Sequence, residues 1–112
     1  MSESRGFIKN HHIIQATTMG ASVNSAPIDG SSLSHIVIEA VWSEGASPVG
    51  TVALQGSVTG TNWIDIGTPI SVSGNSGFGF NQTASASAYG PIRVRFTRTS
   101  GTGTLNVYLS AK

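Results

Sequence analysis

The segment that decides the fold is residues 54–67, which read Leu-Gln-Gly-Ser-Val-Thr-Gly-Thr-Asn-Trp-Ile-Asp-Ile-Gly. Two short alternating runs, residues 51–58 and 62–66, flank Thr59-Gly60, and a glycine readily adopts the positive φ that a tight hairpin turn requires. We therefore predict a β-hairpin. Its Trp63 is expected at the edge of a hydrophobic core, where the indole ring is buried and its N–H finds an acceptor.

Alternating segments recur on both sides of this hairpin. The clearest is residues 34–42, in which every second residue from Ile36 to Trp42 is apolar and is expected to face the core. Residues 91–97 and 105–109 alternate in the same way. The Gly-rich segment 100–103 between them is interpreted as a turn, so the last two strands are predicted to form a second hairpin.

These segments predict an all-β fold. With an early strand at about residues 12–19, the chain has six to eight strands separated by turn signals, which is typical of an antiparallel β-sandwich or a small jelly-roll-like barrel. Residues 10–112 are assigned to a single β-sandwich domain and residues 1–9 to a flexible N-terminal arm. Residues 20–33 are predicted to form a long connection that could cross from one sheet to the other, and residues 68–90 have room for at most two short edge strands.

Composition narrows the classes of partner. Only 10% of the residues are charged and the formal net charge is +1, so no strong field attracts the chain to nucleic acid or to an anionic membrane. The chain has 14 glycines and no cysteine, so it folds without disulfides or thiolate chemistry. No apolar run is long enough for a signal peptide or a membrane helix, so we expect synthesis in the cytoplasm and no nucleic-acid or membrane partner.

Residues for catalysis or metal binding are sparse. The histidines, His11, His12 and His35, lack the spacing of a zinc site, and the five acidic residues lie in separate segments. Glu39 is expected to pair with Arg93 or Arg95 on a neighbouring strand. Neither a nucleophile elbow nor a phosphate-binding glycine loop is present. We therefore predict no enzymatic activity, no metal site and no cofactor.

Two sets of residues are candidates for binding. Arg93 and Arg95 lie on one face of a strand, where they could contact a carboxylate-rich partner or simply form a solvated surface. Trp63 and Tyr89, with Phe78, Phe80 and Tyr108 as further members, could form a platform for a sugar, although their positions also suit a core or a subunit interface. For each set, the binding role and the structural role are both kept as hypotheses.

Several segments of the C-terminal part support a resemblance. They are residues 54–57, 60–63, 89–95, 100–104 and 107–109. Their order resembles that in small β-sandwich virion proteins of tailed bacteriophages, which include capsid decoration proteins and other auxiliary head or tail components. The similarity covers about residues 50–112. It implies a non-enzymatic structural role, as a homo-oligomer seated on the major capsid protein or another virion protein.

The primary hypothesis is therefore a virion protein that decorates or stabilises a capsid. Under this hypothesis the partner contacts are Phe7, Ile8 and Lys9 of the arm, together with Arg93 and Arg95. A low-charge surface suits a protein that packs against copies of itself or against a shell. The alternative is a carbohydrate- or receptor-binding module of a phage tail or a bacterial surface, with Trp63 and Tyr89 as its sugar platform.

Overall fold

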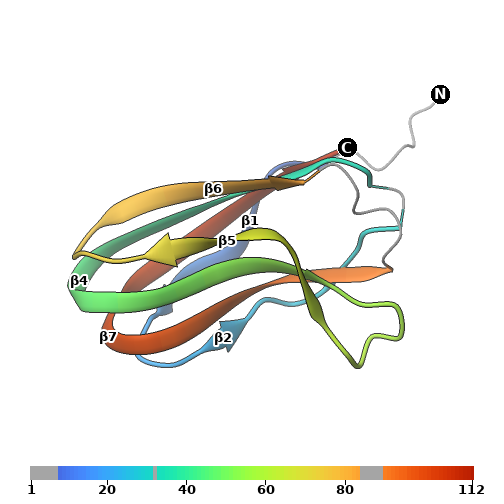
Figure 1. Ribbon diagram of the computed structural model, residues 1–112. Helices are drawn as coiled ribbons and strands as arrows, with labels where there is room; N and C mark the ends of the chain where they lie inside the picture. Colours follow the sequence, from blue (N-terminus) through green and yellow to red (C-terminus); the bar gives the residue numbers. More distant parts are fainter. Residues whose placement is uncertain (1–7, 32, 84–89) are drawn as a thin grey trace.

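The computed structural model describes residues 8–31, 33–83 and 90–112 (Figure 1). Seven strands form one antiparallel sheet, which confirms the predicted all-β class. Two strands of 21 residues each, β4 (Ile36–Gly56) and β7 (Pro91–Ala111), run through its centre. They pair along their whole length, from Ile36 opposite Ala111 to Gly56 opposite Ile92. All other strands attach to this pair.

β4 and β7 bend together near their middles (Figure 1). Their register shifts between Ser43 and Gly50, and Glu44, Ser47 and Gly101 have positive φ values of 53°, 54° and 76° at this place. Bends and bulges of this kind let a strand leave one layer of a sandwich and enter the other. The sheet therefore folds over on itself at this corner and forms both layers of a β-sandwich.

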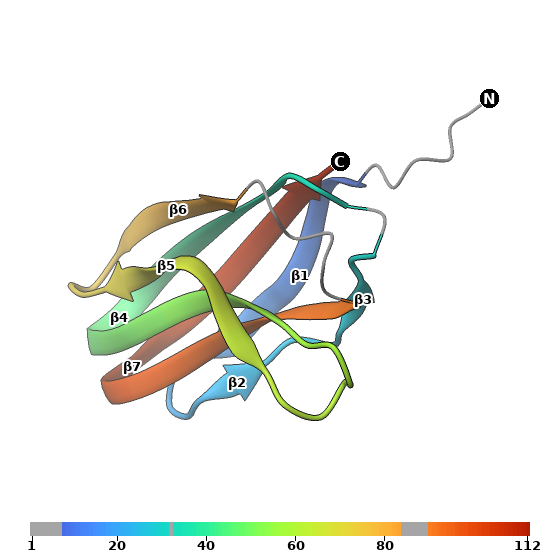
Figure 2. The same cartoon turned by 45° about the vertical axis from the view of Figure 1, so that its right-hand side comes forward.

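The flanking strands divide between two layers (Figure 2). Layer A contains the first half of β4 and the second half of β7, with β1 (Ile8–Thr18) and β6 (Gly77–Thr83) at its edges. Layer B contains the other halves of β4 and β7, with β5 (Ile64–Val72) at one edge and the short β2 (Val23–Asn24) and β3 (Ile28–Asp29) at the other. Because β1 and β2 pair with opposite halves of β7, the chain crosses between layers within residues 19–22, part of the predicted connection.

The core fills the space between the layers. Ile36, Ile38 and Ala40 point inward from layer A, and Val94 and Phe96 meet them from layer B, all of them with no exposed surface. The indole of Trp42 lies in the same cluster and donates its Nε1–H to the backbone oxygen of Ser73 at 3.3 Å. The inward faces of residues 36–42, 92–96 and 105–109 are those that the alternation predicts.

Three predictions about local structure are wrong. Residues 100–103 are not a hairpin turn, because β7 continues through them while each of its halves pairs with β4. The two strands predicted at residues 34–42 and 51–58 are likewise parts of one strand, β4, which begins at Ile36 and ends at Gly56. The Leu54–Gly67 hairpin is present, but its loop is longer than Thr59-Gly60, since the last pair before the loop is Gly56 with Ile64.

The predicted arm is also too long at its inner end. Ile8 lies opposite Ala111, so Ile8 and Lys9 belong to the backbone of β1. Residues 1–7, the remainder of the predicted arm, lie outside the described residues.

Candidate functional site

The first candidate surface is the arginine face, the outer side of layer B around Arg93 and Arg95. The two side chains project outward because Ile92, Val94 and Phe96, which alternate with them, are fully buried. The Arg93 Nε–H donates to Oε1 of Gln55 at 2.9 Å, and Nη1 of Arg95 donates to Oδ1 of Asn24 at 2.8 Å. Both guanidinium groups are therefore oriented by neutral amide oxygens.

Two further residues fix the position of Arg93. Gln55 donates its Nε2–H to Oδ1 of Asp65 at 2.9 Å, so the carboxylate orients the amide that holds the arginine. The guanidinium carbon of Arg93 lies 4.2 Å from the ring centre of Trp63, within the range of a cation–π contact. Partial burial, and secondarily the charge of Arg95, lowers the pKa of Arg93. An arginine remains protonated at neutral pH despite such a shift.

The predicted binding residues are only partly brought together. Trp63 was predicted at the edge of the core, but this is wrong. It is half-buried on the arginine face, outside the core cluster. Tyr89, its predicted partner in a sugar platform, lies outside the described residues, as does Phe7. Ile8 and Lys9 lie on β1 in layer A, whereas Arg93 and Arg95 lie in layer B. The predicted pairing of Glu39 is wrong, because Glu39 lies between Tyr108 and Phe80 in layer A.

The second candidate surface is the aromatic face, the outer side of layer A around Phe78 and Phe80 of β6. Phe78 is 67% exposed and Phe80 is 59% exposed. Their ring centres lie 5.9 Å apart with an interplanar angle of 84°, an edge-to-face pair. They stand opposite Val41 and Glu39 of β4. Two large aromatic side chains are thus exposed on the outer face of an edge strand, where polar side chains are expected.

The inward face of β6 explains why the phenylalanines point outward. A Cβ atom on Gly79 would lie 2.5 Å from Cγ2 of Ile70, and one on Gly77 would lie 2.8 Å from Cζ2 of Trp42. Only glycine fits beneath β6 at these two positions. Shifting the strand by one residue would bury the phenylalanines but would direct their rings into this filled space.

The aromatic face continues across layer A onto β7 and β1. Tyr108 lies opposite Glu39, and its ring stacks on that of His12 at 4.4 Å between centres. The His12 ring nitrogen Nε2 is 2.8 Å from Oδ1 of Asn106, which also accepts a hydrogen bond from the Ala16 backbone N–H. His12 thus takes part in a packed polar cluster. Among the described residues, no group of three or more His, Cys, Asp or Glu side chains is placed to hold a metal ion.

The sequence offered Phe78, Phe80 and Tyr108 as further members of the possible sugar platform, but it did not predict that Phe78 and Phe80 stand exposed together on an edge strand. The signal was present in Gly77-Phe78-Gly79-Phe80, where glycine alternates with phenylalanine. In a strand, such a pattern places both rings on one side and leaves the other side bare. It specifies a two-faced strand, but it does not tell which face is covered.

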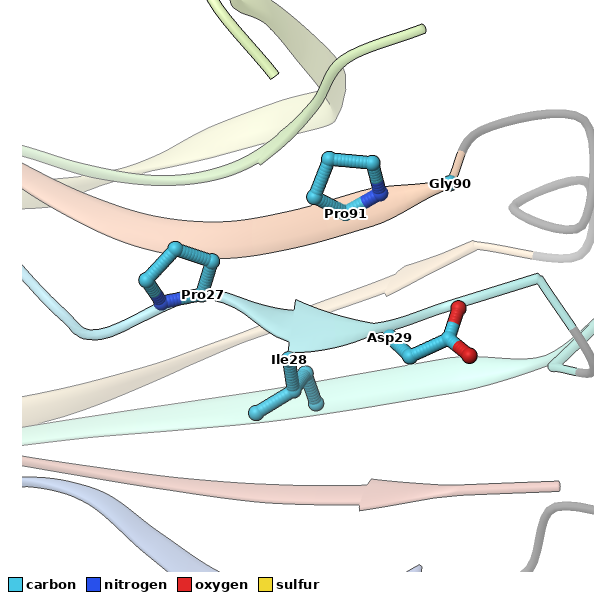
Figure 3. A pocket seen from close by; sticks show the side chains of 5 residues that line it. All are labelled: Pro27, Ile28, Asp29, Gly90 and Pro91. Atoms are coloured by element: carbon cyan, nitrogen blue, oxygen red, sulfur yellow. The ribbon is translucent and has the colours of Figure 1, made fainter. Parts of the chain in front are cut away.

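A shallow pocket lies at the edge of layer B, between β3 and the start of β7. It is lined by Pro27, Ile28, Asp29, Gly90 and Pro91 (Figure 3). Hydrogen bonds from the backbone and side chain of Ser31 lower the pKa of Asp29, with the backbone contribution the larger. Among the described residues, the lining thus supplies one carboxylate, that of Asp29.

Comparison with models of protein families, with curated proteins and with solved structures finds no significant match to this chain. In the part of the chain that the structure describes, no helix is long and apolar enough to span a membrane.

Proposed function

We propose that this chain is a non-enzymatic structural protein of a tailed-phage virion, where it decorates or stabilises the capsid or serves as another auxiliary component. The proposal includes assembly as a homo-oligomer on the major capsid protein or another virion protein. The observation that carries it is the outward orientation of Phe78 and Phe80 on β6.

An exposed aromatic pair favours a role in assembly for two reasons. Large rings contribute strongly to protein interfaces, and an uncharged edge strand is open to pairing with another chain. β6 reads Gly-Phe-Gly-Phe-Asn-Gln-Thr and carries no charged residue that would oppose such pairing. The glycines beneath the rings leave no way to bury them inside the same chain. A second protein surface is therefore the natural cover for the aromatic face.

The direct test is the composition of purified particles. Quantitative mass spectrometry of virions made from the genome that encodes this chain should detect it in many copies per particle. Purified chain added to capsids that lack it should bind to saturation at a fixed ratio, and the double variant F78S/F80S should lose this binding. V58S is the matched control, because Val58 is 78% exposed in the hairpin loop, away from β6. Absence of the chain from particles would refute the proposal.

A second candidate function is carbohydrate or receptor binding by the arginine face. The observation that favours it is the position of Trp63 beside the polar groups of Arg93, Gln55 and Asp65, since sugar sites combine aromatic rings with planar polar side chains. A glycan array tests it. Saturable binding that disappears in W63A would support this function, and an array with no saturable signal would exclude the glycans it displays.

A further inference from the structure

The arginine face carries two positive charges that its described hydrogen bonds do not neutralise. Arg93 donates to the amide of Gln55 and Arg95 to the amide of Asn24, while the nearby carboxylate of Asp65 is bonded to Gln55. The usual surface arrangement pairs arginine with a carboxylate. Among the described residues, this network orients the guanidinium groups and includes no carboxylate bonded to either of them.

The geometry also leaves hydrogen-bonding capacity on both groups. A guanidinium has five N–H donors in a rigid fork, and each of these two uses one nitrogen in its described bond. Since Arg93 donates through Nε, its Nη1 and Nη2 groups form a pair at the end of the guanidinium. Since Arg95 donates through Nη1, its Nε and Nη2 form a second pair. Each pair matches the two oxygens of a carboxylate or phosphate.

The two forks are close together and are held in place. Arg93 and Arg95 are two residues apart on one face of β7, which separates their Cα atoms by about 6.6 Å. Trp63 supports one guanidinium and Gln55 holds it from the neighbouring strand. Such fixed side chains lose less rotational freedom when a ligand binds, which is the basis of preorganised recognition.

We propose that Arg93 and Arg95 form an oxyanion-binding site on the outer face of layer B, which takes a carboxylate or phosphate group of a ligand. Gln55 and Asn24 are positioning residues for the two guanidinium groups. The site lies on the opposite side of the sandwich from Phe78 and Phe80, and it does not depend on the proposed assembly role.

The test is nuclear magnetic resonance of the arginine side chains in the full chain. The Nε–Hε signals of Arg93, Arg95 and Arg98 are followed during separate titrations with inorganic phosphate and with glutarate. Arg98 is the internal control, because its Nε–H donates to the backbone oxygen of Gly101 at the corner of the sandwich. We expect saturable shifts of Arg93 and Arg95 with at least one anion, and small unsaturated shifts of Arg98.

The variants distinguish bidentate binding by a guanidinium group from attraction by its positive charge alone. R93Q and R95Q should each weaken binding about tenfold or more, as expected when a charged, bidentate partner is lost. R93K keeps the charge without the fork and should also weaken binding, whereas R98Q should bind as the unmodified chain does. Unchanged melting temperatures show that each variant is folded.

The two titrations distinguish the ligand chemistry. Tighter binding of glutarate supports a carboxylate ligand, and tighter binding of phosphate supports a phosphate-bearing ligand. Equal, unsaturated shifts of all three arginines with both anions would overturn the proposal. Equal affinity of R93K and the unmodified chain would overturn the bidentate geometry.

Discussion

Replacing Gly79 with alanine tests why β6 presents its aromatic side to solvent. The added Cβ would lie 2.5 Å from Cγ2 of Ile70, whereas ordinary contacts begin at 3.4 Å, so one element must move by nearly an ångström. Overpacking of this kind costs about 1–3 kcal/mol. The alanine also reduces the conformational entropy of the unfolded chain, which stabilises the folded state by roughly 0.4–1 kcal/mol. We therefore expect G79A to lower the free energy of unfolding by roughly 1–2 kcal/mol.

A double-mutant cycle isolates the contact. I70A removes the opposing Cγ2 atom and should by itself cost about 2–5 kcal/mol, because Ile70 is buried. In the I70A background the space on the inward side of Gly79 is open, so adding G79A should leave the free energy of unfolding unchanged or raise it. The expected coupling between the two sites is therefore about 1 kcal/mol or more.

The free energy of unfolding of the unmodified chain, G79A, I70A and the double variant is measured by equilibrium urea unfolding at one fixed protein concentration. The fluorescence of the buried Trp42 is one of the signals. G20A is the control, since its Cβ would meet nothing closer than 3.5 Å and its φ is not in the left-handed region. If G79A costs the same in both backgrounds, to within about 0.5 kcal/mol, the steric explanation for the orientation of β6 is wrong.

Two more predictions concern the corner and the acid response. G101A should cost roughly 2–5 kcal/mol in urea unfolding, because φ at Gly101 is +76° and a Cβ there would collide with the backbone oxygen of Ser47. The hydrogen bonds from Ser31 place the folded pKa of Asp29 below its unfolded value, so their stabilisation is full above a pH of about 3.9 and is lost as the pH falls through the folded pKa. Melting temperatures should show D29A to be less stable than the unmodified chain at neutral pH, with the difference closing in acid; a difference independent of pH would contradict this.

The alternating segments were readable from sequence because burial follows a period of two. The inward positions of residues 36–42, 92–96 and 105–109 are the buried ones, and the all-β class follows from them. The corner was not readable. Gly101 has the positive φ typical of a hairpin turn, but the same conformation serves a bend that β4 and β7 make together. Long-range pairing across the corner, such as that of Ala46 with Thr102, distinguishes the two.

The candidate surfaces, too, were predictable from sequence only in part. Alternation placed Arg93 and Arg95 on an outer face, but the contacts of Arg93 with Gln55 and Trp63 depend on which strands become neighbours. The exposure of Phe78 and Phe80 depends on Ile70 and Trp42, which fill the space beneath β6. Hydrophobicity alone predicts that such rings are buried, and here the steric limits at Gly77 and Gly79 override that tendency.

The central claim is that Phe78 and Phe80 form an interface, and sedimentation velocity over a range of concentrations tests it most directly. The unmodified chain should sediment as a multiple of its 11.5 kDa mass, and F78S/F80S should sediment as a monomer whose far-ultraviolet circular dichroism matches that of the unmodified chain. V58S should keep the assembled mass, since Val58 lies in the hairpin loop and not on β6. A monomeric unmodified chain at every concentration, or an assembled F78S/F80S variant, would contradict the claim.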